Sequence, residues 1–272
     1  MKQRFIIAIM GLTIFTSCSK NLEDVNDNPN NPSTVEADFL LTTSIFESMN
    51  LFGGQMNRAV FYNYTHHYSG FQGEFQRYTY NPGDDATYWK NAYIKCLQPV
   101  HQIVLKYKEN PSYKNRVLIA RIWKDYLFSN AVSMWGAIPT DAALEGTSSV
   151  PYQKEEDIYY NLLNDLKGLT DSIDLTGDKY TALADKVYGG DLLKWKKFAN
   201  TLRLRLAMRI SVANPTIAKQ VVQEVNALEQ YIIQSETETA RAVWDKTSSA
   251  TWSPLYDRVV YNYTANKATI PV

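Results

Sequence analysis

The segment from Asn115 to Trp135 constrains the fold most, because apolar residues cover nearly every face of the helix that it predicts. These apolar residues are Val117, Leu118, Ile122, Trp123, Tyr126, Leu127 and Val132. A helix without a polar face is stable only when other elements surround it. The rest of the chain must therefore supply elements on several sides of this helix, which Gly136 and Pro139 are expected to end.

Helical periodicity recurs on both sides of this segment. Apolar residues three and four positions apart predict helices over residues 39–49, 55–68, 84–107, 151–173, 191–210 and 214–232. Gly53-Gly54 is expected to end the first of them, and Pro99 to kink or split the third. Helices of this length joined by short links pack as antiparallel pairs, so we expect a mostly α fold with few or no strands.

Several helix starts carry recognisable signals. Asp84 and Asp85 offer an N-cap to one helix, Gly189-Gly190 and Asp191 introduce another, and Pro151 is expected to open a third. Asn214, followed by a proline, caps the last. Strand signals are weak and fall at residues 77–80 and 259–261. No clean internal repeat is present, so a repeat-protein stack does not follow from periodicity alone.

The N-terminus has the pattern of a secretory signal peptide. Lys2 and Arg4 precede the apolar run Phe5–Phe15, which is far shorter than the ~20 residues that span a bilayer. Thr16, Ser17 and Cys18 then complete a sequence that resembles a lipobox, where the cysteine is acylated and becomes the new N-terminus. We expect cleavage after residue 17 and lipidation of Cys18. The alternative is an ordinary secretory signal in which the cysteine is incidental.

The remaining chain divides by composition. Residues 18–33 are polar, rich in Asn and Asp, and predict a flexible tether, whereas residues 34–272 predict an α-helical domain. The tether imitates the opening of a calcium loop, but Pro29 and Val35 occupy positions that need Gly and Glu, so we expect no metal site there. Without its signal the chain has two more acidic than basic side chains, which gives no electrostatic basis for binding nucleic acid.

Candidate reactive groups are few. Adjacent His66 and His67 cannot share a helix face as metal ligands at i and i+4 do. Cys96 lies among apolar residues, which predicts a small buried hydrophobe and not a nucleophile. No zincin motif, nucleophile elbow or phosphate loop is present. We therefore expect no enzyme activity, no catalytic residues and no cofactor.

A cationic run follows residue 193, and its members are Lys194, Lys196, Lys197, Arg203, Arg205 and Arg209. We interpret it as a solvated helix face with inter-helix ion pairs, partnered by the acidic turn near Glu155, in preference to an anion site.

The best ligand-binding candidates are aromatic residues outside any helical stripe. They are Tyr68, Phe71, Phe75, Tyr78 and Tyr80. Gly70, Gly73 and Pro82 among them predict a loop, where aromatic rings are available to a ligand or partner. A flat ring presents an apolar face to the C–H groups of a sugar. The alternative is that these rings pack against the scaffold.

Four stretches of the chain resemble the SusD/RagB family of nutrient-binding outer-membrane lipoproteins of Bacteroidota, in particular its second SusD-like branch. They are the lipobox with the Asn-rich tether around Asp27–Asn30, Trp135–Pro139 with Ala142–Leu144, Pro151-Tyr152 leading to Ile158-Tyr159, and Tyr188–Asp191 running through Trp195–Ser211. Ala137 and Thr140 depart from the pattern, since the family often has Asp and Tyr there.

This resemblance implies a tetratricopeptide-like helical scaffold at the cell surface, anchored to the outer membrane. It also implies docking on a SusC-like TonB-dependent transporter, over which the lipoprotein holds a glycan or peptide as a hinged lid. Family members are considerably longer than this chain, so we expect a domain incomplete at its C-terminus, with part of its apolar surface uncovered. The alternatives are a helical adaptor that binds only proteins, and a non-functional truncated product.

Overall fold

The computed structural model describes residues 36–61, 65, 82–147, 149–242, 244, 247, 252–253 and 256. The chain divides into two units, Met1–Glu36 and Ala37–Val272, and every described helix belongs to the second. The boundaries expected for the signal peptide, the tether and the helical domain stay predictions.

Helices dominate the described residues. The α-helices are α3 (Ala37–Ser48), α5 (Pro82–Asn91), α6 (Gln98–Tyr107), α7 (Lys114–Trp135), α8 (Glu155–Ser172), α9 (Leu192–Arg209) and α10 (Pro215–Asn226). Two π-helical segments are η2 (Met49–Phe61) and η4 (Ala92–Leu97), and the 3-10 turns are η5 (Pro111–Tyr113), η6 (Asp141–Leu144), η7 (Glu229–Tyr231) and η8 (Glu236–Glu238). The only β-pairing among these residues is one bridge between Ile138 and Gln153. The mostly α prediction is confirmed, and both weak strand signals lie outside the described residues.

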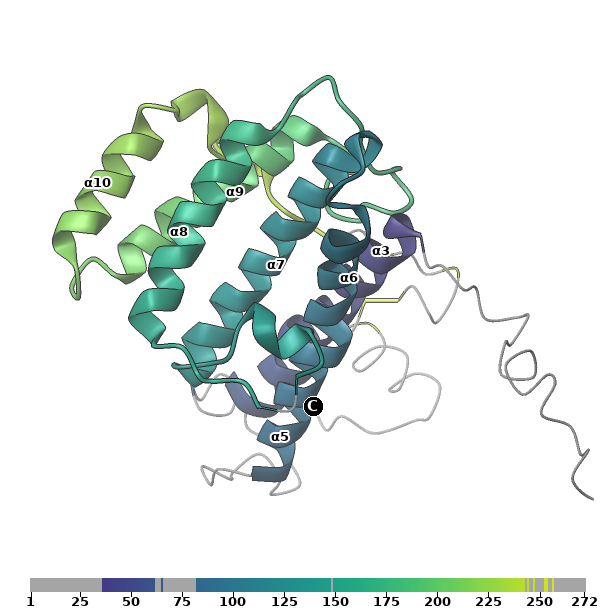
Figure 1. Cartoon of the computed structure of the whole chain (residues 1–272), viewed down its shortest axis with the longest axis vertical. Coiled ribbons are helices and arrows are strands. Elements are labelled where there is room, and N and C mark those ends of the chain that lie inside the picture. The colour runs from purple at the N-terminus through teal and green to yellow at the C-terminus, as the bar shows by residue number, and fades with distance from the viewer. Residues whose placement is uncertain are drawn as a thin grey trace, which may run out of the picture. The chain divides into compact units, whose positions relative to one another are not determined.

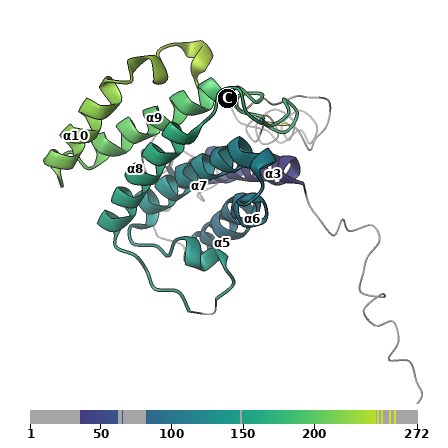
Figure 2. The same cartoon turned by 45° about the horizontal axis from the view of Figure 1, so that its top comes forward.

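Helix α7 lies at the centre of the stack. It contacts α6 and α3 on one side and α8 and α9 on the other, and both views show it between α6 and α8 (Figures 1 and 2). Its side chains are buried around the whole helix, including Ile119, Ile122 and Ala131. Consecutive helices from α6 to α10 pack against each other (Figure 1). The stack of antiparallel helix pairs is therefore confirmed, and the apolar helix at 115–135 is its core.

The start of α7 is capped by a residue far along the chain. The Asp178 carboxylate accepts hydrogen bonds from the backbone N–H groups of Asn115 (2.8 Å) and Arg116 (3.2 Å). The Asn115 side chain in turn donates hydrogen bonds to the backbone carbonyls of Asp174 (2.7 Å) and Asp178 (3.0 Å). Negative charge at a helix N-terminus is favourable, so this contact fixes the 174–178 turn against α7. Gly136 ends the helix in a positive-φ conformation (72°), as expected.

Local signals located some helix ends and missed others. Asp191 and Asn214 cap α9 and α10 by accepting bonds from the N–H groups of Lys194 (3.0 Å) and Ile217 (3.1 Å), which confirms the predicted helix start at Asp191 and the predicted cap at Asn214. Pro99 lies in the first turn of α6, and the π-helical η4 separates α6 from α5. The predicted split of the helix over residues 84–107 is therefore confirmed. Gly53-Gly54 does not end the first helix, because a π-helical segment continues to Phe61.

The predicted starts of two helices are wrong. Helix α5 begins at Pro82, which places Asp84 and Asp85 inside it, and α8 begins at Glu155 and not at Pro151. Pro151 instead lies in the extended segment that precedes the helix.

Asp185 organises the turn before α9. This carboxylate is 1% exposed and accepts bonds from the backbone N–H groups of Val187 (3.0 Å), Tyr188 (3.0 Å) and Gly190 (2.8 Å), and from the indole of Trp195 (2.7 Å). Gly190 has φ 86°, and a Cβ on it would lie 2.3 Å from a backbone oxygen. Residues 188–191 therefore form a turn that Asp185 holds against Trp195, and this turn requires glycine at position 190.

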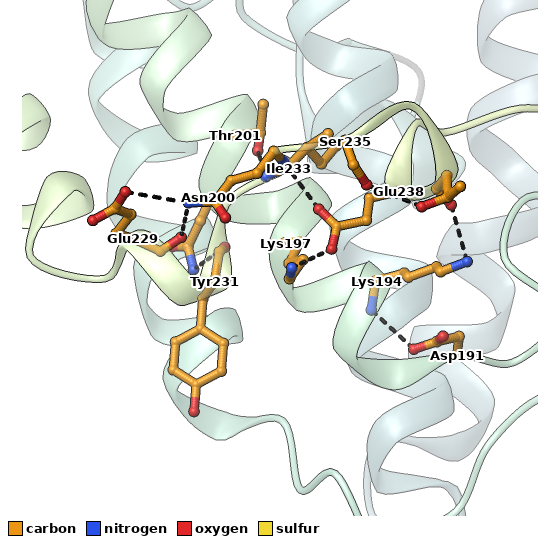
Figure 3. A network of polar contacts seen from close by, with 12 residues as sticks. Asp191, Lys194, Lys197, Asn200, Thr201, Glu229, Tyr231, Ile233, Ser235 and Glu238 are labelled. Atoms are coloured by element: carbon orange, nitrogen blue, oxygen red, sulfur yellow. Dashed lines mark hydrogen bonds and ion pairs between the residues drawn. The ribbon is translucent and has the colours of Figure 1, made fainter.

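Residues 233–238, which follow α10, bind to α9 through polar contacts (Figure 3). Lys197 forms an ion pair with Glu238, Thr201 accepts a bond from the N–H of Ile233 (3.0 Å), and Lys194 donates to the carbonyl of Thr237 (3.0 Å). In the same cationic run, Arg203 pairs with Glu224 (2.8 Å). The expected ion pairing is confirmed, but its partners are these two glutamates and not the turn near Glu155.

We expect Gly190→Ala to lower the free energy of unfolding by about 3 kcal/mol or more, since it combines positive-φ strain with a backbone clash. Gly146→Ala is the matched control, because Gly146 also has positive φ (77°) but open space around it, and strain alone costs about 1 kcal/mol. Urea unfolding of both variants measures the difference. Equal losses would contradict the clash.

Replacing Glu224 with Gln should destabilise the fold at pH 7 by about 3 kcal/mol, because Arg203 is 2% exposed and would lose its counter-ion. Bonds from Gln220, then Lys167 and Arg203, lower the pKa of Glu224 to about 2. A lowered carboxyl pKa contributes stability that is present above about pH 4.5 and is lost as the pH falls towards 2. The gap between the two proteins should therefore shrink over that range.

Urea midpoints at pH 7, 4.5 and 2.5 measure this gap. Exposed Glu109→Gln is the control and should change little. A gap that stays constant with pH would show that the ion pair is not its source.

Candidate functional site

The predicted ligand-binding loop lies outside the described residues. Tyr68, Phe71, Phe75, Tyr78 and Tyr80 are all in this group, as is the lipidation site Cys18. Their roles stay predictions. The described chain resumes at Pro82, where α5 follows the predicted loop directly in sequence.

A second group of aromatic side chains lies partly exposed at the ends of α5 and α7. Trp89 stacks on Tyr152 (centroids 6.1 Å apart, interplanar angle 16°) and meets Trp135 edge to face (5.2 Å, 73°). Tyr93 packs against Trp89 (4.9 Å) and is itself buried. We call Trp89, Trp135 and Tyr152 the aromatic platform. Tyr152 is its most exposed member, at 64%.

The segment from 136 to 154 holds the platform in place. After the turn at Gly136, Asp141 contacts Lys124 of α7. The N–H of Gln153 donates to the carbonyl of Ile138 (3.0 Å) and joins the two ends of this segment. The Tyr93 hydroxyl donates to the carbonyl of Pro139 (2.6 Å), and burial raises the pKa of this tyrosine. The indole of Trp135 donates to the carboxylate of Asp85 (2.9 Å). Rings held by such contacts lose little entropy when a ligand binds.

A cavity of about 530 Å³ lies between α7 and α8 beneath the same segment. Four residues of α7 face it at the spacing i, i+3, i+4 and i+7: Arg121, Lys124, Asp125 and Phe128. Four residues of α8 repeat that spacing: Ile158, Asn161, Leu162 and Asp165. This spacing puts each set on one helix face, so two facing stripes form the walls. Thr140, Asp141, Gln153 and Asn164 complete the lining.

Charged groups in this cavity are paired. Lys124 is buried and binds both carboxylate oxygens of Asp141 (2.8 Å each), and Arg121 pairs with Asp165. Asp125 is 4% exposed, and its carboxyl shares a hydrogen bond with the Asp165 carboxyl. Burial, followed by the neighbouring Asp165 carboxyl, raises the pKa of Asp125 well above its ordinary value. Both effects favour the uncharged form of this carboxyl.

The remaining candidate groups are structural. Cys96 is buried, and burial raises the pKa of its thiol to about 12, which confirms the expected small hydrophobe. His101 is buried, and burial followed by Lys124 lowers its pKa, so it is a neutral core side chain. Within the described ranges, no three His, Cys, Asp or Glu side chains gather as a metal site would require. The described helices also include none with the length and low charge needed to cross a bilayer.

Comparison with known families identifies the fold. Residues 29–268 match the model of a SusD-like family described as "Starch-binding associating with outer membrane". The chain belongs to this SusD-like family. No curated protein matches it.

Solved SusD-like structures share the fold. A chitin-binding protein is 25% identical, with a TM-score of 0.67 over 75% of this chain and 45% of that one. A Bacteroidetes SusD-like protein is 22% identical (TM-score 0.73, covering 87% and 46%), and a SusD homolog from Parabacteroides distasonis is 20% identical (TM-score 0.73, covering 85% and 46%). The chain spans less than half the length of these proteins.

Two of the SusD-like stretches converge on the site. Trp135–Pro139 supplies one platform ring and the turn behind it, and Pro151-Tyr152 supplies another ring. Both stretches carry the family resemblance, but neither is predicted as a site from the sequence. Trp89 was missed because it belongs to a helical stripe, which predicts a core position. The cavity was missed because Arg121, Lys124 and Asp125 fall within a segment dominated by apolar residues.

Asp125→Asn should gain stability relative to the unaltered protein as the pH rises. A carboxyl whose pKa is raised on folding loses stability above its unfolded pKa of about 3.9, because the unfolded state ionises first. The amide keeps the shape of the acid without this loss. Thermal melts from pH 4 to 8 test it, with exposed Asp171→Asn as the control. Parallel curves for Asp125→Asn and the unaltered protein would contradict a raised pKa for Asp125.

Proposed function

We propose that the chain is a cell-surface lipoprotein that captures a glycan and delivers it to a SusC-like TonB-dependent transporter in the outer membrane. Membership of the SusD-like family and its starch-binding description support this function. The fold shared with a chitin-binding protein supports a carbohydrate ligand further. The protein itself performs no chemistry on the glycan.

The observation that carries the proposal is the aromatic platform. The exposed ring of Tyr152 stacks on the ring of Trp89 at an interplanar angle of 16°, so Trp89 supports it and its outer face is a flat apolar surface open to a ligand. A sugar stacks its C–H face on such a surface, while its hydroxyls stay available to polar neighbours. Trp135 extends the surface at its edge. Aromatic side chains of this kind dominate the energy of many binding surfaces.

The predicted loop contributes further rings in this proposal. Tyr68, Phe71, Phe75, Tyr78 and Tyr80 immediately precede α5, the helix that carries Trp89. We propose that the loop and the platform contact one extended ligand. A peptide ligand is the alternative for the same surface, and a protein-binding adaptor is the alternative for the whole chain.

Membrane attachment through Cys18 completes the proposal. Two or more acyl chains on one cysteine give stable anchoring, at roughly 0.8 kcal/mol per buried methylene. The Asn-rich tether over residues 18–33 then lets the helical domain reach a transporter partner.

Trp89→Ala and Tyr152→Ala should each weaken glycan binding about tenfold, or ~1.4 kcal/mol, because Tyr152 supplies the exposed face and Trp89 holds that ring in place. Isothermal titration of the mature chain with chitin- and starch-derived oligosaccharides measures this. Phe39→Ala is the matched control, since Phe39 is an aromatic residue of α3 that is 69% exposed and outside the platform. Unchanged affinity in both platform variants would remove the platform from the site.

The same titration tests the predicted loop through Phe75→Ala and Tyr78→Ala. We expect a similar loss for each, because a longer glycan needs several stacking positions. If the loop variants bind as well as the unaltered protein, the loop is not part of the site. Binding of protein partners with no glycan bound would favour the adaptor.

Cys18→Ala should release the protein from membranes, because the acyl chains on this cysteine are the proposed anchor. Fractionation of cells, with mass spectrometry of the mature N-terminus, measures it. Retention of the variant in the membrane fraction would contradict anchoring through this cysteine.

A further inference from the structure

A buried histidine of α6 lies in a position that favours its neutral form. His101 is 4% exposed, and neither of its ring nitrogens has a hydrogen-bonding partner in the described part of the chain. A protonated imidazole has two N–H donors and a full charge. A buried charge without a partner is costly, so protonation of His101 opposes the observed packing.

The chain that follows α7 packs over this histidine. We call residues 137–147 the covering segment. Gln98 precedes His101 by three residues, which places both on one face of α6. The Gln98 side chain donates to the carbonyl of Leu144 (3.2 Å), and α6 contacts η6 of the covering segment. Movement of this segment away from α6 would therefore expose the histidine ring to water.

Three charged groups face His101 from the elements packed against it. Lys124 faces it from α7, and Asp141 and Glu145 face it from the covering segment. Both carboxylate oxygens of Asp141 already bind the Lys124 ammonium (2.8 Å each). Burial, followed by Lys124, lowers the pKa of His101, and the two carboxylates offset this only in part.

The charged residues of α3 and η4, which also pack against α6, have partners of their own. Asp38 of α3 pairs with Arg116 (3.7 Å), and Glu47 of α3 pairs with Lys95 of η4 (3.8 Å). The charge balance at His101 is therefore set by α7 and the covering segment.

The covering segment also positions the aromatic platform. Its Ile138 carbonyl accepts the bond from the N–H of Gln153 (3.0 Å), and Gln153 adjoins Tyr152 of the platform. If the segment moved away from α6 and α7, this bond would break. Tyr152 would then lose the backbone contact that holds it beside Trp89.

We propose that His101 is an acid-sensitive switch, whose protonation favours an open state in which the covering segment leaves α6 and the aromatic platform comes apart. In the open state the ring is hydrated and binds a proton at its ordinary pKa of about 6.5, whereas the closed state resists it. Below that pH, each further unit therefore raises the ratio of open to closed protein up to about tenfold. A role in glycan release rests on the proposed function, but the opening itself does not.

Hydrogen–deuterium exchange of the full mature chain measures the opening at the N–H of Gln153. After correction for the pH dependence of free amides, its protection should fall up to about tenfold from pH 6.5 to 5.5, where Asp141 and Glu145 stay ionised. The N–H of Ile233, which bonds to the Thr201 hydroxyl (3.0 Å) in non-helical backbone, is the matched control and should keep its protection. Unchanged protection at Gln153, or an equal fall at both amides, would overturn the proposal.

Variants assign the effect to the histidine. His101→Leu and His101→Gln place an apolar and a polar side chain that do not ionise in this range, so both should abolish the fall in protection at Gln153. Neither change removes a hydrogen bond of the ring nitrogens. Gln102→Leu, at the neighbouring exposed position of α6, is the control and should keep the fall. A fall that persists in either folded histidine variant would overturn the assignment.

A glycan arm separates the switch from the proposed function. At pH 5.5, saturating chitin- or starch-derived oligosaccharide should restore protection at Gln153, because a ligand that binds only the closed state stabilises it. Bound glycan with no gain in protection would refute the coupling of the covering segment to the platform. If no oligosaccharide binds at any pH, the proposed glycan capture fails, whereas the pH dependence at Gln153 still decides whether the switch exists.

Discussion

The burial of α7 on all sides is the constraint on which the rest of the structure depends. A helix in that position needs neighbours on every face, and α3, α6, α8 and α9 supply them. The same helix carries Lys124 and Asp125 into the interior, where Lys124 requires Asp141 as its partner. Because Asp141 belongs to the segment after α7, this ion pair holds that segment against α7 beside the cavity.

The aromatic platform follows from this arrangement. The bridge between Ile138 and Gln153 fixes the segment that follows Gly136. It thereby holds the neighbouring Tyr152 against Trp89 at the end of α5. The platform is thus assembled from three distant parts of the chain by one turn and one bridge. Rigid elements position its rings, which is the condition for binding a ligand without a large ordering cost.

Local patterns were sufficient for the fold class and for several helix ends. Asp191 and Asn214 cap helices because a short polar side chain reaches its own backbone, and this depends only on nearby residues. The cap that Asp178 provides for α7 joins residues more than sixty positions apart, so no local pattern contains it. The glutamates that neutralise Lys197 and Arg203 were missed for the same reason.

The candidate site was harder to predict than the fold. Aromatic residues in a loop attract attention, whereas Trp89 and Trp135 belong to helices and resemble core residues until their exposure is known. The facing stripes of α7 and α8 repeat one spacing, but only the packing of the two helices shows that they share a cavity. Family membership assigns the scaffold, and the position of the exposed rings points to the candidate platform.

Hydroxyl-radical footprinting of the mature protein, read by mass spectrometry with and without chitin- or starch-derived oligosaccharides, tests the central claim most directly. Glycan capture on the platform predicts that Tyr152 and Trp89 become protected from oxidation in a saturable way, while exposed Phe39 does not change. Equal oxidation of the platform rings with and without every glycan tested would contradict the account.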